Sequence, residues 1–214
     1  MQIILTIFDI IFGLIYIYLG VYSLYLFIFS VCGRFIKVPP PPPAERQLKF
    51  VVYIPAYKED AIILNTAARA LEIDYPAHLY HVCVIADKLQ PETVARLKGM
   101  PLQVVEVFFE SSTKSRALHK AIENTAGGFD AAIVYDIDNI AAPDFITHIN
   151  RYLAARYKVV QGHRVALNTE SPIAMLDAIS EEINNHLFRK AQRVFNLSAA
   201  IIGSGMALEY QLFT

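Results

Sequence analysis

The chain has 214 residues, of which 55% are hydrophobic and 18% charged, and its formal net charge is −1 at pH 7. This composition is too apolar for a disordered segment, and the charge is not basic enough to indicate a nucleic-acid partner. The two cysteines, Cys32 and Cys83, have neither a disulfide framework nor zinc-site spacing, so we interpret both as small buried hydrophobic residues.

Much of the apolar character comes from one segment near the amino terminus. Residues 10–32 contain no charged side chain and are long enough to cross the hydrocarbon core of a bilayer as a helix. A cleaved signal peptide is the alternative, but no Lys or Arg precedes the run and no small-residue cleavage site follows it. We therefore predict that residues 1–33 form a transmembrane helix.

Basic residues follow this segment, and none precedes it. They are Arg34, Lys37, Arg46 and Lys49. The positive-inside bias places the chain after Cys32 in the cytoplasm, which predicts a membrane protein with a single amino-terminal span.

Residues 34–48 form a proline-rich linker. Its five consecutive prolines, residues 39–43, favour an extended and semi-rigid conformation. We interpret the linker as a spacer between the membrane and a domain at residues 49–214. A ligand for a proline-recognition domain is the alternative.

Apolar runs with the length of strands alternate with helical patterns after this linker. The expected strands are residues 50–54, 80–85, 102–108 and 131–135, and the expected helices are residues 61–71, 91–97 and 115–125. Such alternation implies right-handed crossovers. We therefore predict an α/β domain whose parallel sheet has helices on both faces.

Acidic side chains follow several of these strands. Glu59 follows the first strand, Asp87 the second, and Asp136 and Asp138 the fourth. The carboxyl ends of parallel strands meet at one edge of the sheet, where ligands bind, so we expect these acids to gather there. Two carboxylates at i and i+2 repel each other unless a cation lies nearby, and Mg²⁺ or Mn²⁺ is a usual partner. The alternative is that the acids face water or cap a following helix.

The last third of the chain predicts two more strands and a long helix. Residues 158–166 alternate as a strand does, and residues 199–202 form a second strand that leads into Gly203, Ser204 and Gly205. Apolar positions recur at three- and four-residue steps over residues 172–194, which predicts an amphipathic helix. Its apolar stripe either packs on the sheet, which is the more common use, or lies on a membrane surface.

Four short motifs occur in a fixed order along the domain. They are Pro55-Ala56-Tyr57-Lys58-Glu59, Ile85-Ala86-Asp87, the run from Lys114 to His119, and Asp136-Ile137-Asp138. Together they resemble the family 2 inverting glycosyltransferases, within the membrane-anchored cellulose-synthase-like and N-acetylglucosaminyltransferase-like enzymes. The resemblance covers residues 51–213. It implies a glycosyltransferase A-type fold, with a Rossmann-like, mixed and mostly parallel sheet, and a nucleoside diphosphate sugar as the donor.

The resemblance assigns a role to each residue of these motifs. Ala56, Tyr57 and Glu59 match the motif that holds the nucleoside, with Tyr57 against the base and Glu59 near the ribose. Asp87 matches the acid that pairs with the uracil edge, and a carboxylate is a suitable acceptor for the ring N–H of uracil. Lys114 matches a basic residue beside the diphosphate.

The acid pair and the glycine-rich turn also have counterparts in the family. Asp136 matches the acid directed towards the ribose or the metal, and Asp138 the acid that ligates Mg²⁺ or Mn²⁺. The cation would bridge the two phosphates and stabilise charge on the departing nucleoside diphosphate. Gly203, Ser204 and Gly205 match the turn beneath the sugar and the acceptor, where glycine allows the backbone to approach a ligand closely.

The chain departs from the family pattern at several points. Lys88-Leu89-Gln90 follows Asp87 where small residues are usual, and His119 stands where Asn is common. The family's catalytic base and its Gln-x-x-Arg-Trp motif do not occur before Thr214. Inversion needs a base within reach of the acceptor hydroxyl. We therefore expect the base beyond Thr214 and interpret the chain as the amino-terminal part of the enzyme.

The resemblance thus implies a metal-assisted membrane enzyme that transfers a sugar, most simply from a UDP-sugar, to a glycan or lipid acceptor with inversion. It also allows for membrane-protein partner subunits. A competing interpretation is a catalytically incomplete fragment, or a nucleotide-sugar-binding protein that keeps the donor pocket without the base. A nucleotidyltransferase would need a basic, glycine-rich loop near the first strand, and residues 55–60 do not provide one.

Overall fold

The computed structural model of the chain describes residues 2–213 and contains two compact units. Unit 1 comprises Met1–Pro39 and Arg164–Ala200, and unit 2 comprises Pro40–His163 and Ile201–Thr214. Each unit therefore combines segments that are far apart in the sequence.

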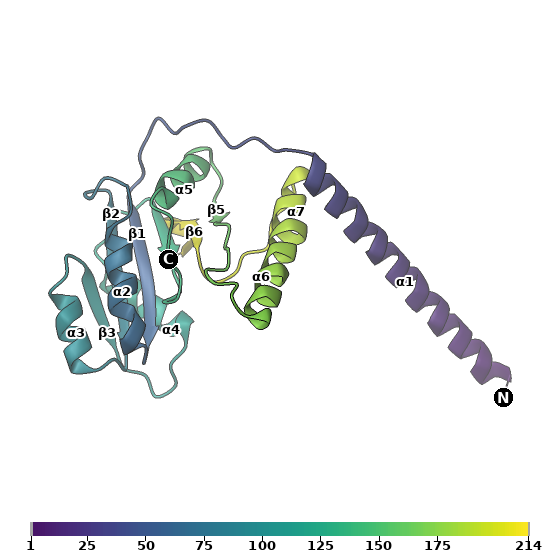
Figure 1. The fold of residues 1–214 in the computed structure, drawn as a ribbon, viewed down its shortest axis with the longest axis horizontal. Helices are drawn as coiled ribbons and strands as arrows, with labels where there is room; N and C mark the ends of the chain where they lie inside the picture. The colour runs from purple at the N-terminus through teal and green to yellow at the C-terminus, as the bar shows by residue number, and fades with distance from the viewer. Residues whose placement is uncertain (1, 214) are drawn as a thin grey trace. The chain divides into compact units, whose positions relative to one another are not determined.

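Unit 2 is built on a six-stranded sheet with the strand order β3-β2-β1-β4-β6-β5 (Figure 1). The strands are β1 (Phe50–Tyr57), β2 (Tyr80–Asp87), β3 (Gln103–Val107), β4 (Ala131–Val134), β5 (Val159–Gln161) and β6 (Met206–Glu209). The first four strands pair in parallel, whereas β6 runs antiparallel to both β4 and β5. This mixed, mostly parallel sheet confirms the predicted fold class.

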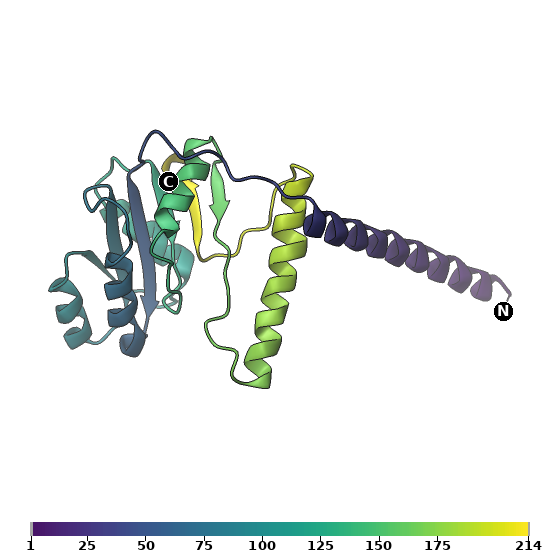
Figure 2. The same ribbon diagram turned by 45° about the horizontal axis from the view of Figure 1, so that its top comes forward.

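Helices cover both faces of this sheet (Figures 1 and 2). Helices α2 (Asp60–Leu71), α3 (Pro91–Lys98) and α5 (Phe145–Ala154) pack on one face, and α4 (Lys114–Asn124) and α8 (Tyr210–Phe213) pack on the other. Along β1, Phe50, Val52 and Ile54 are buried in the first core, and Val51 and Tyr53 in the second. Burial on both faces explains why β1 has a continuous apolar run instead of an alternating pattern.

Strand β1 is longer than the predicted residues 50–54, because it continues through Pro55 to Tyr57. Its pairing with β4 ends at Tyr53, whereas its pairing with β2 continues to Tyr57. Pro55 therefore lies where β1 has lost one neighbour, and a residue without an N–H group is tolerated at such an edge.

The two predicted carboxyl-terminal strands need correction. The prediction of a strand at residues 199–202 is wrong, because β6 begins only at Met206, after the turn at residues 203–205. Gly205 has a φ of +63°, and its N–H donates to the Val134 carbonyl at 2.8 Å, so the chain turns there before it enters the sheet. The strand expected at residues 158–166 is shorter and comprises only β5. The Gly162 N–H makes one more hydrogen bond, to the Gly205 carbonyl at 2.8 Å, and the chain then leaves the sheet.

Unit 1 consists of α1 (Gln2–Phe35), α6 (Pro172–Asn185), the π-helical turn η1 (His186–Lys190) and α7 (Ala191–Val194). Helix α1 contains the predicted residues 10–32 and, with a mean hydropathy of 2.3 in its most apolar window, is long and apolar enough to cross a membrane. The last three elements confirm the predicted helix at residues 172–194. It begins where expected for a capped helix, since the Ser171 hydroxyl accepts the Ala174 N–H and Pro172 follows the cap.

The amino-terminal half of this helix's apolar stripe is exposed, whereas Ala191 near its end is buried. Ile173 and Leu176 are 74% and 66% exposed, and Ile179 and Ile183 are exposed to about half of their surface. No element described in unit 1 therefore covers this part of the stripe, and its packing on the sheet stays a prediction. The spacing alone could not reveal this, because a three- and four-residue repeat is the same for a core helix and for a helix on a membrane surface.

Candidate functional site

The carboxyl ends of β1, β2 and β4 bring the motif residues to one edge of the sheet. Tyr57 and Asp87 are the last residues of β1 and β2 and pair with each other in the register of the two strands. The Lys58 N–H donates to the Asp87 carbonyl at 3.1 Å, which fixes the two loops together. Asp136 lies two residues beyond the end of β4, the neighbour of β1 on the other side.

The Asp87 side chain is buried and lacks a donor for one of its oxygens. Asp87 is 3% exposed, and Ala56 in the adjacent strand β1 is 1% exposed. Asp87 Oδ1 has no hydrogen-bond partner within residues 2–213. A buried acceptor without a partner costs about 1–3 kcal/mol, and more when it is charged. Such an atom in a folded protein calls for an explanation, and a donor brought by a ligand is one.

An exposed aromatic ring and two lysines lie beside this carboxylate. Tyr57 is 46% exposed, and the ammonium groups of Lys58 and Lys88 lie 5.3 and 5.6 Å from the centre of its ring. Both lysines have positive φ angles, 57° and 56°, so the chain makes the same sharp turn after β1 and after β2. The result is a flat ring bordered by positive charge, which suits a ligand that has an aromatic base and phosphates. Sequence reasoning treated Lys88 only as a departure from the family pattern.

Asp60 holds the loops after β1 and β2 together. Its Oδ1 accepts the Gln90 N–H at 2.8 Å, and hydrogen bonds from Thr93 and Gln90 lower the pKa of the Asp60 carboxyl. Glu59 precedes it as the N-cap residue of α2 and makes no side-chain cap hydrogen bond in the described part of the chain. Sequence reasoning missed Asp60, because an acid in the first turn of a helix is ordinary.

A lysine supplies the positive charge that the acid pair requires. Lys114 is the first residue of α4, which Thr113 caps, and its Nζ forms an ion pair with Asp136 and donates to the Gly203 carbonyl at 2.6 Å. The Lys114 and Asp136 side chains are 37% and 40% exposed, so the pair is accessible from solvent. Asp138 is exposed at the same turn. This arrangement joins α4, the loop after β4 and the glycine-rich turn.

The Ser204 hydroxyl is directed into the protein and holds the acid-pair loop. Ser204 is 1% exposed, and its Oγ accepts the Asp136 N–H at 2.8 Å and a second hydrogen bond from the Asn139 amide. The Asn139 N–H in turn donates to the Asp136 carbonyl at 3.1 Å, which closes the turn. Ser204 therefore positions the acid pair, and its assignment to the sugar and the acceptor stays a prediction. Asn139 was missed, because its position after the acid pair carries no distinctive pattern.

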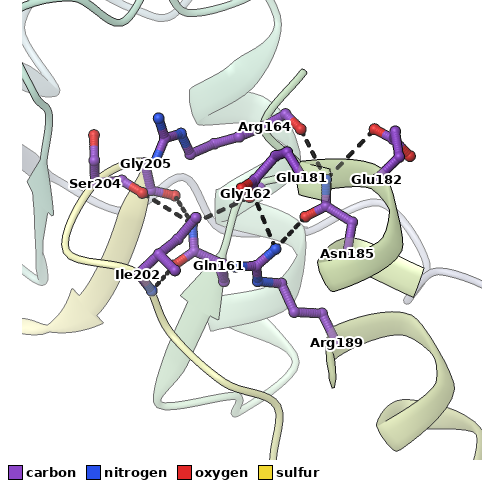
Figure 3. A network of polar contacts seen from close by, with 10 residues as sticks. All are labelled: Gln161, Gly162, Arg164, Glu181, Glu182, Asn185, Arg189, Ile202, Ser204 and Gly205. Atoms are coloured by element: carbon purple, nitrogen blue, oxygen red, sulfur yellow. Dashed lines mark hydrogen bonds and ion pairs between the residues drawn. The ribbon is translucent and has the colours of Figure 1, made fainter. Parts of the chain in front are cut away.

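Gln161, at the end of β5, braces the glycine-rich turn (Figure 3). Its Nε2 donates to the Ser204 carbonyl at 2.9 Å, and its Oε1 accepts the Ile202 N–H at 2.9 Å. A Cβ atom on the next residue, Gly162, would lie 2.7 Å from the Phe145 ring and 3.0 Å from the Gly205 carbonyl oxygen. Only glycine fits at this position, which lets the turn approach β5 closely.

The residues at this edge fit a divalent cation that a ligand helps to hold. Asp136 and Asp138 provide carboxylate oxygens, the donors that Mg²⁺ and Mn²⁺ prefer. Within residues 2–213, no group of three or more His, Cys, Asp or Glu side chains could hold a metal ion. Two carboxylates leave most of the coordination shell to water and to ligand oxygens such as those of a diphosphate.

Comparison with known proteins places this arrangement in a family. Residues 47–214 match the family described as glycosyltransferase like family 2. A search of curated proteins found no match. Among solved structures, the chain is similar to the mannosyltransferase PcManGT from Pyrobaculum calidifontis in complex with GDP-Man and Mn²⁺, with 20% identity and a TM-score of 0.65, over 89% of this chain and 53% of that one. It is also similar to a mycobacterial protein, with 16% identity and a TM-score of 0.51, over 77% of this chain and 54% of that one.

The chain spans about half the length of these two solved structures. At this level of identity, the likeness to them shows the fold. The family match extends over residues 47–214, which is most of the chain and all of the edge described above. The chain therefore belongs to the glycosyltransferase-like family 2.

Proposed function

We propose that this chain is the donor-binding part of a membrane-anchored enzyme that transfers a sugar from a nucleoside diphosphate sugar to a glycan or lipid acceptor with inversion. A UDP-sugar is the proposed donor, and Mg²⁺ or Mn²⁺ the proposed cofactor. The observation that carries this proposal is the single sheet edge at which the unpaired Asp87 oxygen, the Asp136–Asp138 pair and Lys114 lie together.

The order of strands gives the donor a direction across this edge. Asp87 ends β2, Tyr57 ends β1, and Asp136 follows β4, and these strands are neighbours in the sheet. Asp87 would accept a hydrogen bond from the base, Tyr57 would contact the flat face of the base, and Lys114 would face the diphosphate. Ala56 and Glu59 lie on either side of Tyr57 in the chain. Glu59 is assigned to the ribose, and Ala56 to the nucleoside.

The residues around the acid pair determine what happens at the phosphates. A cation held by Asp138 and Asp136 would stabilise negative charge on the leaving nucleoside diphosphate. Lys114 would exchange Asp136 for a phosphate oxygen, because both are anions within reach of one flexible side chain. Ser204 and Gln161 keep the acid pair and the Gly203–Gly205 turn fixed while this exchange occurs.

The neighbouring mannosyltransferase supports the donor class and the cation, since its structure contains GDP-Man and Mn²⁺. That donor contains guanine and not uracil. Guanine also offers N–H donors to a carboxylate, so Asp87 suits either base, and a comparison of UDP with GDP decides between them.

Calorimetric titration of the full chain with UDP, with and without Mn²⁺, tests donor and metal binding together. We expect each ligand to raise the affinity of the other by the same factor, because such coupling is reciprocal. Asp138→Asn should abolish the coupling, and Asp144→Asn, which changes an exposed acid nearby, should retain it. Equal UDP affinity with and without Mn²⁺ in the folded protein would refute the metal site. Tighter binding of GDP than of UDP would reassign the base.

Turnover distinguishes an enzyme from a protein that only binds the donor. An enzyme releases UDP from a UDP-sugar when an acceptor is present, whereas a binding protein returns the donor intact. We assign no catalytic base within residues 2–213 and propose that it lies in a segment after Thr214. Acceptor-dependent release of UDP by a protein that includes such a segment, and none by residues 1–214 alone, would support the proposal of an enzyme.

The membrane anchor can be tested separately. Helix α1 and the basic residues that follow it support an amino-terminal span with the chain from Lys49 onward in the cytoplasm. In a Cys32→Ala background, Gln2→Cys should react with an impermeant thiol reagent in intact cells, and Ala44→Cys should react only after lysis. Labelling of Ala44→Cys before lysis would contradict the orientation.

A further inference from the structure

The long helix of unit 1 is bonded to the end of α1. His186 Nε2 lies 2.9 Å from the Ser30 carbonyl oxygen, and the Gln192 amide donates to the Tyr25 hydroxyl. The rings of Phe29 and Phe195 lie 4.4 Å apart. All three partners on α1 belong to the uncharged run of residues 10–32. The elements η1 and α7 therefore contact the last two turns of the segment proposed to span the membrane.

Small residues allow a close approach at this contact. Gly33 is the buried residue among those described in α1, and a Cβ atom there would lie 2.9 Å from the Ala191 Cβ and 3.3 Å from the His186 ring. Ala191 is fully buried, and its N–H donates to the His186 carbonyl across the π-helical turn η1. Close packing of small residues is typical of helix pairs in membranes. The contact fixes the start of α7 against the end of α1.

Two polar contacts hold one side of α6 within unit 1. Arg189 pairs with Glu181 at 3.2 Å, and the Asn185 amide donates to the Arg164 carbonyl at 2.8 Å (Figure 3). The side chains of Arg189 and Glu181 are only 13% and 28% exposed. Polar contacts thus hold Glu181 and Asn185 on this side of the helix, whereas the apolar stripe and Asp177 are exposed.

This apolar stripe borders a groove that opens next to α1. The stripe consists of Ile173, Leu176, Ile179 and Ile183, all exposed. A groove of about 520 Å³ lies between Ser30 of α1 and the side chains of Ile179 and Ile183. The groove is lined mainly by apolar atoms and is open at the surface.

We propose that α6 lies in the cytoplasmic interface of the lipid bilayer, with the apolar stripe among the acyl chains and the groove occupied by lipid. This inference rests on the proposed span of α1. Because Tyr25 and Ser30 belong to the apolar run, the elements bonded to them lie at the edge of the hydrocarbon core. An amphipathic helix at that depth buries its apolar face about 5–10 Å into the boundary between headgroups and acyl chains.

Charge supports a lipid occupant over a protein one. Arg34 and Lys37 follow the contact with α7 directly and lie where the headgroups of anionic lipids would be. Val165 and Leu167, which precede α6, are 70% and 82% exposed and extend the apolar surface beyond the helix. A lipid surface covers such a scattered set of apolar side chains without needing a matching shape.

Fluorescence quenching in nanodiscs tests this proposal with the full chain. In a Cys32→Ala background, a fluorophore is attached to Leu176→Cys or, as the matched control, to Asp177→Cys, the neighbouring exposed residue of α6. The parent protein without an added cysteine corrects for any labelling of the buried Cys83. The discs contain phosphatidylcholine and phosphatidylglycerol, with a nitroxide near the top of the acyl chain, and iodide is added as the aqueous quencher. We expect the lipid nitroxide to quench Leu176→Cys several-fold more than Asp177→Cys, and iodide to show the reverse order.

Three results would overturn the inference. Equal quenching of the two positions by lipid, or iodide access to Leu176→Cys, would place the stripe in water. Protection of Leu176→Cys from both quenchers would show that a protein surface covers the stripe. Failure of a nitroxide deep in the bilayer to quench Leu14→Cys, in the middle of α1, would remove the span on which the inference rests. UDP titration of the same discs separates these outcomes from a failure of the donor site.

Discussion

The two sides of the sheet edge in unit 2 differ in how completely their polar groups are bonded. On the side formed by β1 and β2, Asp87 Oδ1 is buried without a donor within the described residues, and the Tyr57 ring is exposed. On the side formed by β4 and β6, Lys114 bonds to Asp136 and to the Gly203 carbonyl, and the Ser204 hydroxyl accepts two hydrogen bonds.

This difference indicates two modes of ligand binding. A ligand on the first side supplies a donor that the protein lacks, so binding there adds a hydrogen bond without breaking one. A ligand on the second side competes with bonds that already exist, because Lys114 occupies an oxygen of Asp136. We therefore expect the base to bind independently, and the cation and the diphosphate to bind together. Four substitutions test this comparison.

The largest effect is expected for Ser204→Ala on the second side. This change leaves the Asp136 N–H and the Asn139 amide without their acceptor, so the free energy of unfolding should fall by about 2–3 kcal/mol. Urea unfolding of the full chain in detergent measures it. Ser112→Ala is the control, because the Ser112 hydroxyl is buried but has no partner among residues 2–213, and its removal should change stability little. Equal losses in the two variants would show that the bonds to Ser204 contribute nothing.

Asp87→Ala should separate binding from stability on the first side. UDP affinity should weaken by about 1–3 kcal/mol, since the N–H of the base loses its acceptor. The free energy of unfolding should not fall, because the substitution removes a buried oxygen that lacks a donor. Calorimetry and unfolding of the same preparation measure both quantities, and Asp74→Ala, at an exposed acid away from the edge, is the control. A loss of stability equal to the loss of affinity would show that Asp87 is a structural residue.

The sequence predicted the first side of the edge better than the second. Local signals were sufficient for β1, β2 and β4, because each is an apolar run that ends in a polar residue, and parallel pairing then brings their ends together. That is how Glu59, Asp87 and the Asp136–Asp138 pair could be placed at one edge, whereas Tyr57 was assigned only through the family resemblance. The exposed state of Tyr57 and the positive φ of Lys58 and Lys88 had no sequence signal, because neither lysine is a residue type that favours this conformation.

The second side depends on contacts that are distant in the sequence. Ser204 and Asn139 are 65 residues apart, and Gln161 reaches the Ser204 carbonyl over 43 residues. A strand was expected at residues 199–202 because its residues are apolar, but β6 begins at Met206 because Gly205 turns the chain against Val134. Pairing register of this kind is set by the tertiary fold and is not encoded in a short apolar run.

Lys114→Met should strengthen cation binding when no nucleotide is present. The substitution removes the ammonium group that pairs with Asp136, and an exposed ion pair of this kind is worth up to about 1 kcal/mol. Mn²⁺ affinity should therefore rise by up to about fivefold, as measured by the free Mn²⁺ signal in electron paramagnetic resonance. Lys120→Met is the control, because Lys120 lies on the same helix and pairs with Glu123 instead. Unchanged or weaker Mn²⁺ binding would show that Lys114 does not compete with the cation.

The smallest effect concerns the sheet beneath both sides, where Cys83 lies in β2. Burial raises the pKa of the Cys83 thiol from its ordinary value of 9.0 to about 12. Below pH 9 the thiol is neutral in the folded and unfolded states. As pH rises above 9, the unfolded chain loses the proton while the folded protein keeps it, so this contribution to stability declines and is lost by about pH 12.

Cys83→Ala isolates this contribution, because the other titrating groups are the same in both proteins. Between pH 8 and pH 9.5, the wild type should lose about 0.8 kcal/mol more unfolding free energy than the variant. Any cavity left by the substitution affects both pH values equally and cancels in the difference. The same loss in the two proteins would mean that water reaches the thiol and that the sheet opens beneath Asp87. The two sides of the edge would then differ in how firmly their strands are held, and not only in the bonding of their loops.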